Sequence, residues 1–204
     1  MFRTASITCF IIVLVGVTIH CLASRPKLAA LCSKKARQKL SLIGVLRRLA
    51  YLLALLCFAV LLVTGFAPRL VFAKPISGYW SMLHVTAAPV FTVCVAVLAV
   101  MWAHNCRLDK NYWPWLQRIL RRKTPNEAAP EKYELTLKIC FWLIILLVPP
   151  LALSVIVCMF PLFGTHWQQF FASVHRYCAL PFALLVIIHT YLIILTQANK
   201  MAAK

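Results

Sequence analysis

The chain has 204 residues, of which 63% are hydrophobic, and a mean hydropathy of +0.85, which together exclude a soluble globular protein. Its net charge of +18 would suit a nucleic-acid partner, but eight Lys and Arg lie in 25–48 and seven in 105–135, against two in 66–77 and none in 161–170. This alternation follows the positive-inside rule, so it predicts a membrane protein with cytoplasmic basic loops and no nucleic-acid partner.

Five apolar segments are long enough to span a bilayer, and they leave no room for a separate soluble domain. They cover about 5–24, 49–68, 78–104, 136–160 and 170–196. The sequence therefore predicts an all-α integral membrane protein with five transmembrane helices.

The charge distribution also predicts the topology in the cytoplasmic membrane, with the N-terminus outside and the C-terminus in the cytoplasm. A signal peptide is an alternative for the first segment, but only Arg3 precedes its apolar run and the dense charge follows it, which favours a retained helix. The basic segment that follows can contact anionic lipid head groups. We divide the chain into N-terminal helix, basic cytoplasmic segment, bundle and cytoplasmic tail at 1–24, 25–48, 49–196 and 197–204.

Two histidines in the last segment, His175 and His189, are separated by fourteen residues. At 100° per residue this spacing brings both rings to one face of a helix, with a rise of about 21 Å between them. Ionisable side chains inside a membrane usually face the bundle interior with a partner, and a neutral imidazole there is a good axial ligand for haem iron. Hydrogen bonds to neighbouring helices are the simpler alternative for each ring.

His84 in the third segment has the same predicted depth as His175, because each follows an outer connection by a few residues. The two helices would present the halves of one bis-histidine site. Nine cysteines include no C-x-x-C pair, which argues against a covalently attached haem or a metal cluster. We expect His104 to lie at the interface and His166 in a short outer loop.

Several short motifs occur in a specific order along the chain. They are Leu83-His84, Trp102-Ala-His104-Asn with Trp113-Pro-Trp115-Leu, Lys132-Tyr133 before Cys140-Phe-Trp142, and His175 followed by His189-Thr-Tyr191. In this order, residues 47–196 resemble the cytochrome b subunit of membrane-bound formate dehydrogenases and related hydrogenase cytochromes. The resemblance implies a four-helix haem-binding bundle with two b haems, accompanied here by one additional N-terminal transmembrane helix. It also implies that the haems receive electrons on the outer face from an iron–sulphur or multihaem subunit, which a catalytic subunit serves, and pass them to menaquinone near the cytoplasmic face.

By this resemblance, His84 and His175 ligate the outer haem and His189 is one ligand of the inner haem. The family's second inner ligand is a histidine in an Arg-x-x-His-Trp pattern, but here the pattern reads Arg48-Leu-Ala-Tyr51-Leu. Three explanations stay open: Tyr51 ligates the iron, His20 replaces the missing ligand, or the inner haem is five-coordinate or absent.

The family's quinone pocket corresponds here to a region that offers four polar residues, Tyr133, Glu134, Lys138 and His189. We therefore expect an electron-relay subunit of an oxidoreductase complex that exchanges electrons with menaquinone or another quinone and is not catalytic by itself. The alternative is a cofactor-poor membrane anchor for a peripheral redox complex. A solute carrier is disfavoured, because the predicted spans contain no Asp or Glu and no internal repeat.

Overall fold

The computed structural model describes residues 2–24, 42–107, 133–160 and 164–202. These residues form five α-helices and no strand, and each helix is long and apolar enough to cross a membrane. The prediction of an all-helical chain with five candidate membrane spans is therefore confirmed. The helices are α1 (Phe2–Ala23), α3 (Leu42–Leu70), α4 (Gly78–Ala103), α6 (Glu134–Met159) and α7 (Thr165–Ala202).

Two of the helices extend beyond the segments expected from hydropathy. Helix α3 begins at Leu42, inside the expected basic segment, and α7 continues to Ala202 through most of the expected cytoplasmic tail. Helix α7 also begins at Thr165, so His166 lies in its first turn and not in a loop. Hydropathy marks only the part of a helix that sits in hydrocarbon, whereas the 38 residues of α7 span about 57 Å. Residues 25–41 lie outside the described ranges.

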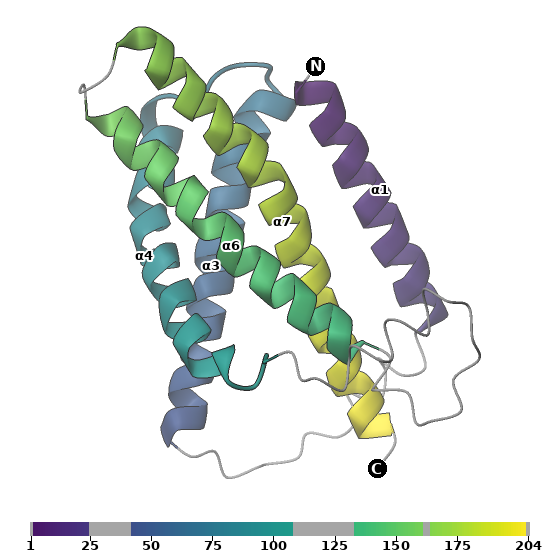
Figure 1. Cartoon of the computed structure of the whole chain (residues 1–204). Helices are drawn as coiled ribbons and strands as arrows, with labels where there is room; N and C mark the ends of the chain where they lie inside the picture. The colour runs from purple at the N-terminus through teal and green to yellow at the C-terminus, as the bar shows by residue number, and fades with distance from the viewer. Residues whose placement is uncertain (1, 25–41, 108–132, 161–163, 203–204) are drawn as a thin grey trace, which may run out of the picture.

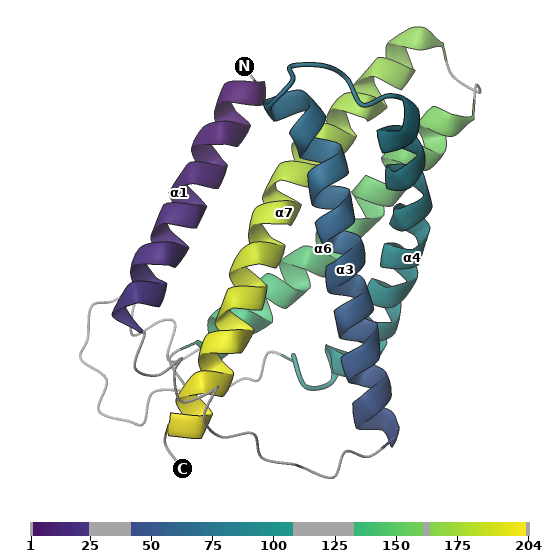
Figure 2. The same cartoon turned by 180° about the vertical axis from the view of Figure 1, so that it is seen from behind.

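The helices pack as two antiparallel pairs, α3 with α4 and α6 with α7 (Figures 1 and 2). Helix α1 lies on one flank of this bundle, against α7 and α3, and Ser6 is its only buried residue. The connection 71–77 lies at the same end as the N-terminus, and residues 104–107 lie at the end of the C-terminus (Figure 1). We call these the outer and inner ends, after the predicted topology.

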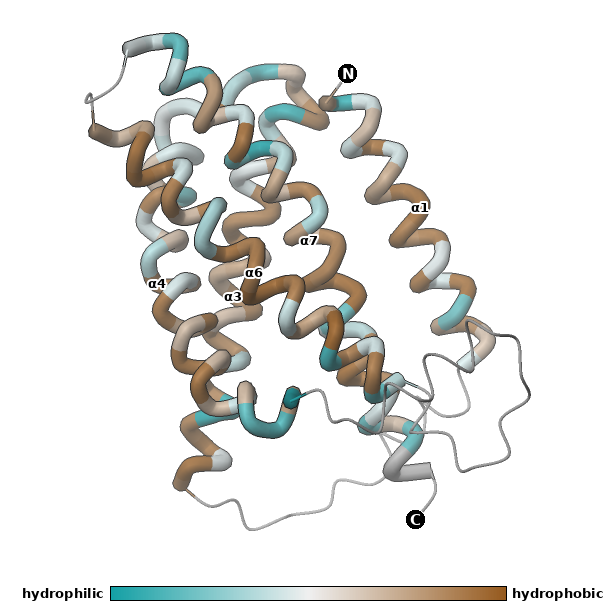
Figure 3. Tube along the Cα trace, in the orientation of Figure 1, coloured by the Kyte–Doolittle hydropathy of each residue, from teal (hydrophilic) through white to brown (hydrophobic). Residues whose placement is uncertain are grey.

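Hydrophobic residues predominate along the helices between the two ends (Figure 3), and many of their side chains are exposed, as expected for a surface that faces lipid. Leu56 is 63% exposed and Val100 82% exposed. The buried core contains Phe58 of α3, Phe91 of α4 and Phe182 of α7, whose ring centroids are 5.9 to 6.4 Å apart. We call these three rings the aromatic layer.

Candidate functional site

Two histidine rings lie close together in the outer half of the bundle. His84 comes from α4 and His175 from α7, and their ring centroids are 6.4 Å apart at an interplanar angle of 79°. Both side chains are partly buried. The structure thus brings together the two histidines whose depths the sequence matched.

Hydrogen bonds from neighbouring helices orient both rings through Nδ1. The buried Thr64 hydroxyl donates to the Val60 carbonyl at 2.7 Å, so it can accept a hydrogen bond from His84 Nδ1 at 2.9 Å. His175 Nδ1 donates to the Leu151 carbonyl at 3.1 Å. Because a neutral imidazole carries one proton, these bonds leave the Nε2 lone pair of each ring available for a metal.

Gly65 allows α3 to approach the His84 ring closely. A Cβ atom at this position would lie 3.1 Å from His84 Cε1. A larger residue would therefore push the imidazole away from the position in which Thr64 holds it. Thr64 and Gly65 together set where the His84 ring can lie.

A second site lies between α3, α4, α6 and α7 in the inner half of the bundle. It is a cavity of about 70 Å³, lined among others by Tyr51, Trp102 and His189. The Tyr51 hydroxyl and His189 Nδ1 are both buried, and neither makes a well-formed hydrogen bond within the described residues. Buried polar atoms without partners are unfavourable, so this cavity is suited to a group that binds them.

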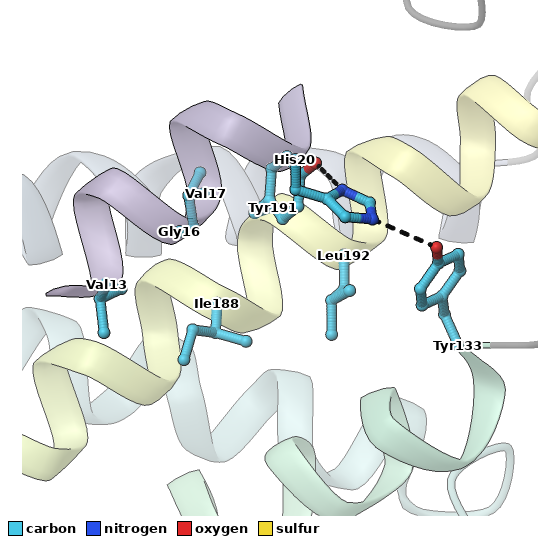
Figure 4. Close-up of a pocket in the computed structure, with 8 residues that line it drawn as sticks. All are labelled: Val13, Gly16, Val17, His20, Tyr133, Ile188, Tyr191 and Leu192. Atoms are coloured by element: carbon cyan, nitrogen blue, oxygen red, sulfur yellow. Dashed lines mark hydrogen bonds between the residues drawn. The ribbon is translucent and has the colours of Figure 1, made fainter. Parts of the chain in front are cut away.

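His20 does not line the cavity of His189. It lies near the end of α1, where its Nδ1 is 2.5 Å from the Tyr191 hydroxyl and its Nε2 is 3.4 Å from the Tyr133 hydroxyl (Figure 4). These three side chains line a different cavity, of about 320 Å³, between α1, α7 and the start of α6. In the sequence, Tyr191 stood out only as part of the motif His189-Thr-Tyr191. Nothing in that motif indicated its contact with His20.

The four residues expected to bind quinone are divided between different surroundings. Tyr133 lies beside His20, whereas His189 lines the inner cavity. Lys138 is buried and forms an ion pair with Glu134, one helical turn earlier, at 3.0 Å. Neither of these two cavities is lined by all four residues.

A comparison with protein families identifies the chain. The family model of prokaryotic cytochrome b561 matches residues 43–201, which include both histidine-bearing helices and the inner cavity. The chain belongs to the prokaryotic cytochrome b561 family. A search of curated proteins and a search of solved structures each found no match.

Membership of the cytochrome b561 family makes the chain a membrane b-type cytochrome that acts in transmembrane electron transfer. Helix α1 lies outside the matched residues, as does His20. His104 ends α4 as an exposed residue, and His166 is exposed at the start of α7. The histidines inside both the bundle and the cytochrome b561 match are therefore His84, His175 and His189.

The outer pair fits the haem b that this family binds. Two imidazoles on opposite sides of one metal, each about 2 Å from it, have ring centres roughly 6 Å apart. The 6.4 Å between the His84 and His175 centroids agrees with that value. The orientation of both Nδ1 atoms toward oxygen acceptors is also typical of metal-binding histidines.

Replacing Thr64 with valine is expected to weaken haem binding at the outer site about tenfold or more. The substitution keeps the shape of the side chain but removes the acceptor for His84 Nδ1, and loss of such a hydrogen bond to a metal-binding histidine has effects of about 10–100-fold. The measurement is the transfer of haem from the purified variant to excess apomyoglobin.

Thr86→Val is the matched control for this experiment. The Thr86 hydroxyl also donates to a carbonyl four residues earlier, that of Met82, at 2.8 Å, but it is exposed. Its haem should transfer at the rate of the unaltered protein. Equal rates for the Thr64 and Thr86 variants would show that the hydrogen bond to His84 does not hold the ligand in place.

Proposed function

We propose that this cytochrome carries electrons across the membrane between a redox partner on the extracytoplasmic side and a lipid-soluble quinone, with menaquinone as the first candidate. The observation that supports this most is the pair of sites at different depths of one bundle. His84 and His175 face each other in its outer half, and His189 lines a cavity in its inner half. Such an arrangement provides a path along the membrane normal.

In this proposal the outer site holds a haem b between two histidines, and the inner site holds a second haem with His189 as its one histidine ligand. Tyr51 lines the same inner cavity from α3, at the position where the formate dehydrogenase cytochromes have a histidine. A neutral phenol is a poor ligand for a low-spin electron-transfer iron. We therefore infer that His189 alone would hold a haem at the inner site, with Tyr51 as a neighbouring side chain and not a ligand.

The proposed partner is an electron-transfer subunit, of the iron–sulphur or multihaem type, that docks at the outer end together with a catalytic subunit. The resemblance of residues 47–196 to formate dehydrogenase and hydrogenase cytochromes supports this choice. The distribution of Lys and Arg supports the topology, with eight in 25–48 and seven in 105–135 on the cytoplasmic side. The outer histidine pair would then lie nearest to the electron donor.

Anaerobic reoxidation of the purified cytochrome by a quinone tests the proposed function. The protein in lipid nanodiscs is reduced with stoichiometric dithionite and mixed with menaquinone-4, and the α-band of the reduced haem is followed. We expect reoxidation together with the appearance of menaquinol in a lipid extract, because the quinone accepts the electrons. Already reduced menaquinol-4 is the control and should leave the haem reduced.

Haem that stays reduced in the presence of menaquinone-4 would refute the quinone as electron acceptor. A pyridine haemochrome assay on the same preparation distinguishes an electron carrier from a cofactor-poor membrane anchor, because an anchor would contain no haem. Haem in stoichiometric amount, reoxidised by the quinone, is the expected result.

A further inference from the structure

The cavity beside α1 is not part of the four-helix bundle. Four of its lining residues belong to α1 and three to α7, namely Val13, Gly16, Val17 and His20, and Ile188, Tyr191 and Leu192. Its volume of about 320 Å³ is at the lower end of the range for small-molecule sites. We call it the α1 groove. It exists only because this chain has a helix that lies outside the family match.

One end of the α1 groove is polar, and the rest is apolar (Figure 4). His20 sits between the two phenols of Tyr191 and Tyr133, at 2.5 and 3.4 Å. A neutral imidazole has one donor and one acceptor nitrogen, so it offers opposite roles to the two hydroxyls. The longer contact, to Tyr133, is the weaker one, which leaves that hydroxyl able to turn to a bound molecule.

The residues that line the groove indicate the class of its ligand. The described residues that line it are Val, Gly, Ile and Leu, apart from His20, Tyr133 and Tyr191. The imidazole and the phenols can each donate or accept a hydrogen bond to a neutral oxygen. The flanking residues of α1, such as Ile12 and Ile19, are exposed on the lipid-facing surface. A neutral ring with polar oxygens and an apolar tail meets all these conditions.

We propose that the α1 groove binds the head group of a lipid-soluble quinone, with its ring oxygens hydrogen-bonded by His20, Tyr133 and Tyr191 and its isoprenoid tail in the bilayer. This inference rests on the proposed function, and it places the quinone outside the bundle, away from the four residues expected from the family.

The position of α7 relates the groove to the electron path. Ile188 and Tyr191 line the groove, whereas the two residues between them in the sequence, His189 and Thr190, line the inner cavity. The two sites therefore lie on different sides of a single helix, whose diameter with side chains is about 10 Å. A quinone in the groove would be separated from the ligand of the inner site by this helix alone.

Two substitutions test the groove in different ways. Gly16→Leu should fill it, because a Cβ at Gly16 meets no atom within 4 Å and the added side chain has room to enter. Tyr191→Phe removes one hydroxyl that contacts His20. Tyr177→Phe makes the same change on the outer half of α7, where the exposed Tyr177 packs edge-on against Phe2 at 5.4 Å, and serves as the control.

The measurement is the equilibrium binding of menaquinone-4 to the purified haem-loaded protein, with bound quinone quantified by extraction and chromatography. We expect binding about tenfold or more weaker in the Gly16 and Tyr191 variants and unchanged in the Tyr177 variant. The haem absorption spectrum should be the same in all of them. A photoreactive azido-naphthoquinone should label peptides that contain residues 13–20 or 188–192.

Binding that is equally tight in the unaltered protein and in both groove variants would overturn the quinone site. If the haem of the unaltered protein is still reoxidised by menaquinone-4 in that case, the proposed function stands and the groove assignment alone is wrong. Conversely, groove-dependent binding without haem reoxidation would support the site and refute the proposed function. Absence of binding to the unaltered protein would overturn the groove assignment as well.

Discussion

Replacing His84 or His175 with alanine is expected to remove one low-spin b-haem from the protein. In the unaltered protein the two ring centroids of the outer site are 6.4 Å apart. Each alanine substitution leaves a single imidazole on one side of that site. The remaining histidine cannot keep the iron six-coordinate and low-spin by itself. The expected result is loss of the bis-histidine electron paramagnetic resonance signal, because any haem that the remaining histidine still holds would be high-spin.

Alanine at His166 is the control for this experiment, since that side chain is exposed at the start of α7. It should retain the full haem content and the full spectrum. Circular dichroism of each variant separates loss of haem from loss of the helical fold. An unchanged low-spin signal in both the His84 and the His175 variants would exclude this pair as the ligands.

The second large effect is expected at the inner site. We expect two haems per chain in the unaltered protein, one of them high-spin, and only the outer one after His189→Ala. His189 Nδ1 is buried in the inner cavity and makes no hydrogen bond within the part of the chain that the structure describes, so it is the group on that wall best placed to bind. The measurements are the haem-to-protein ratio and the high-spin signal in the electron paramagnetic resonance spectrum of the oxidised protein.

Substitutions at Tyr51 identify what faces the inner iron. Tyr51→His should convert the high-spin signal into a second low-spin signal, because it places an imidazole in the cavity that His189 lines. Tyr51→Phe should leave the haem content and spectrum as they are. A single haem per chain in the unaltered protein, unaffected by His189→Ala, would mean that the inner cavity holds no haem.

The membrane fold could be predicted from the sequence because hydropathy and segment length decide it almost alone. The pairing of His84 with His175 could be predicted as well, because both follow outer connections by a similar number of residues. Their ring separation in the structure agrees with this pairing, and their role as haem ligands stays a prediction. The ends of the helices were harder to predict, because α3 begins at Leu42 and α7 continues to Ala202, both outside the apolar segments.

The surroundings of each histidine could not be predicted, because they depend on the rotation of neighbouring helices. Thr64 is twenty residues from His84 in the sequence, and Tyr191 is 171 residues from His20. His20 was considered as a ligand of the inner haem on the basis of depth. The structure places His20 at the inner end of the bundle, as expected, but on the other side of α7 from the inner cavity, beside Tyr133 and Tyr191.

The aromatic layer has a consequence for the membrane voltage. Phe182 lies midway between His175 and His189 along α7, and its phenyl ring packs with those of Phe58 and Phe91 in the core. Phenyl rings offer no hydrogen-bonding chain for proton hopping, whereas an electron can tunnel past them. Moving one elementary charge across the full thickness of the bilayer changes its electrostatic energy by about 2.3 kcal/mol per 100 mV of membrane potential. An electron that passes this layer without an accompanying proton would therefore make turnover electrogenic and sensitive to the energised state of the cell.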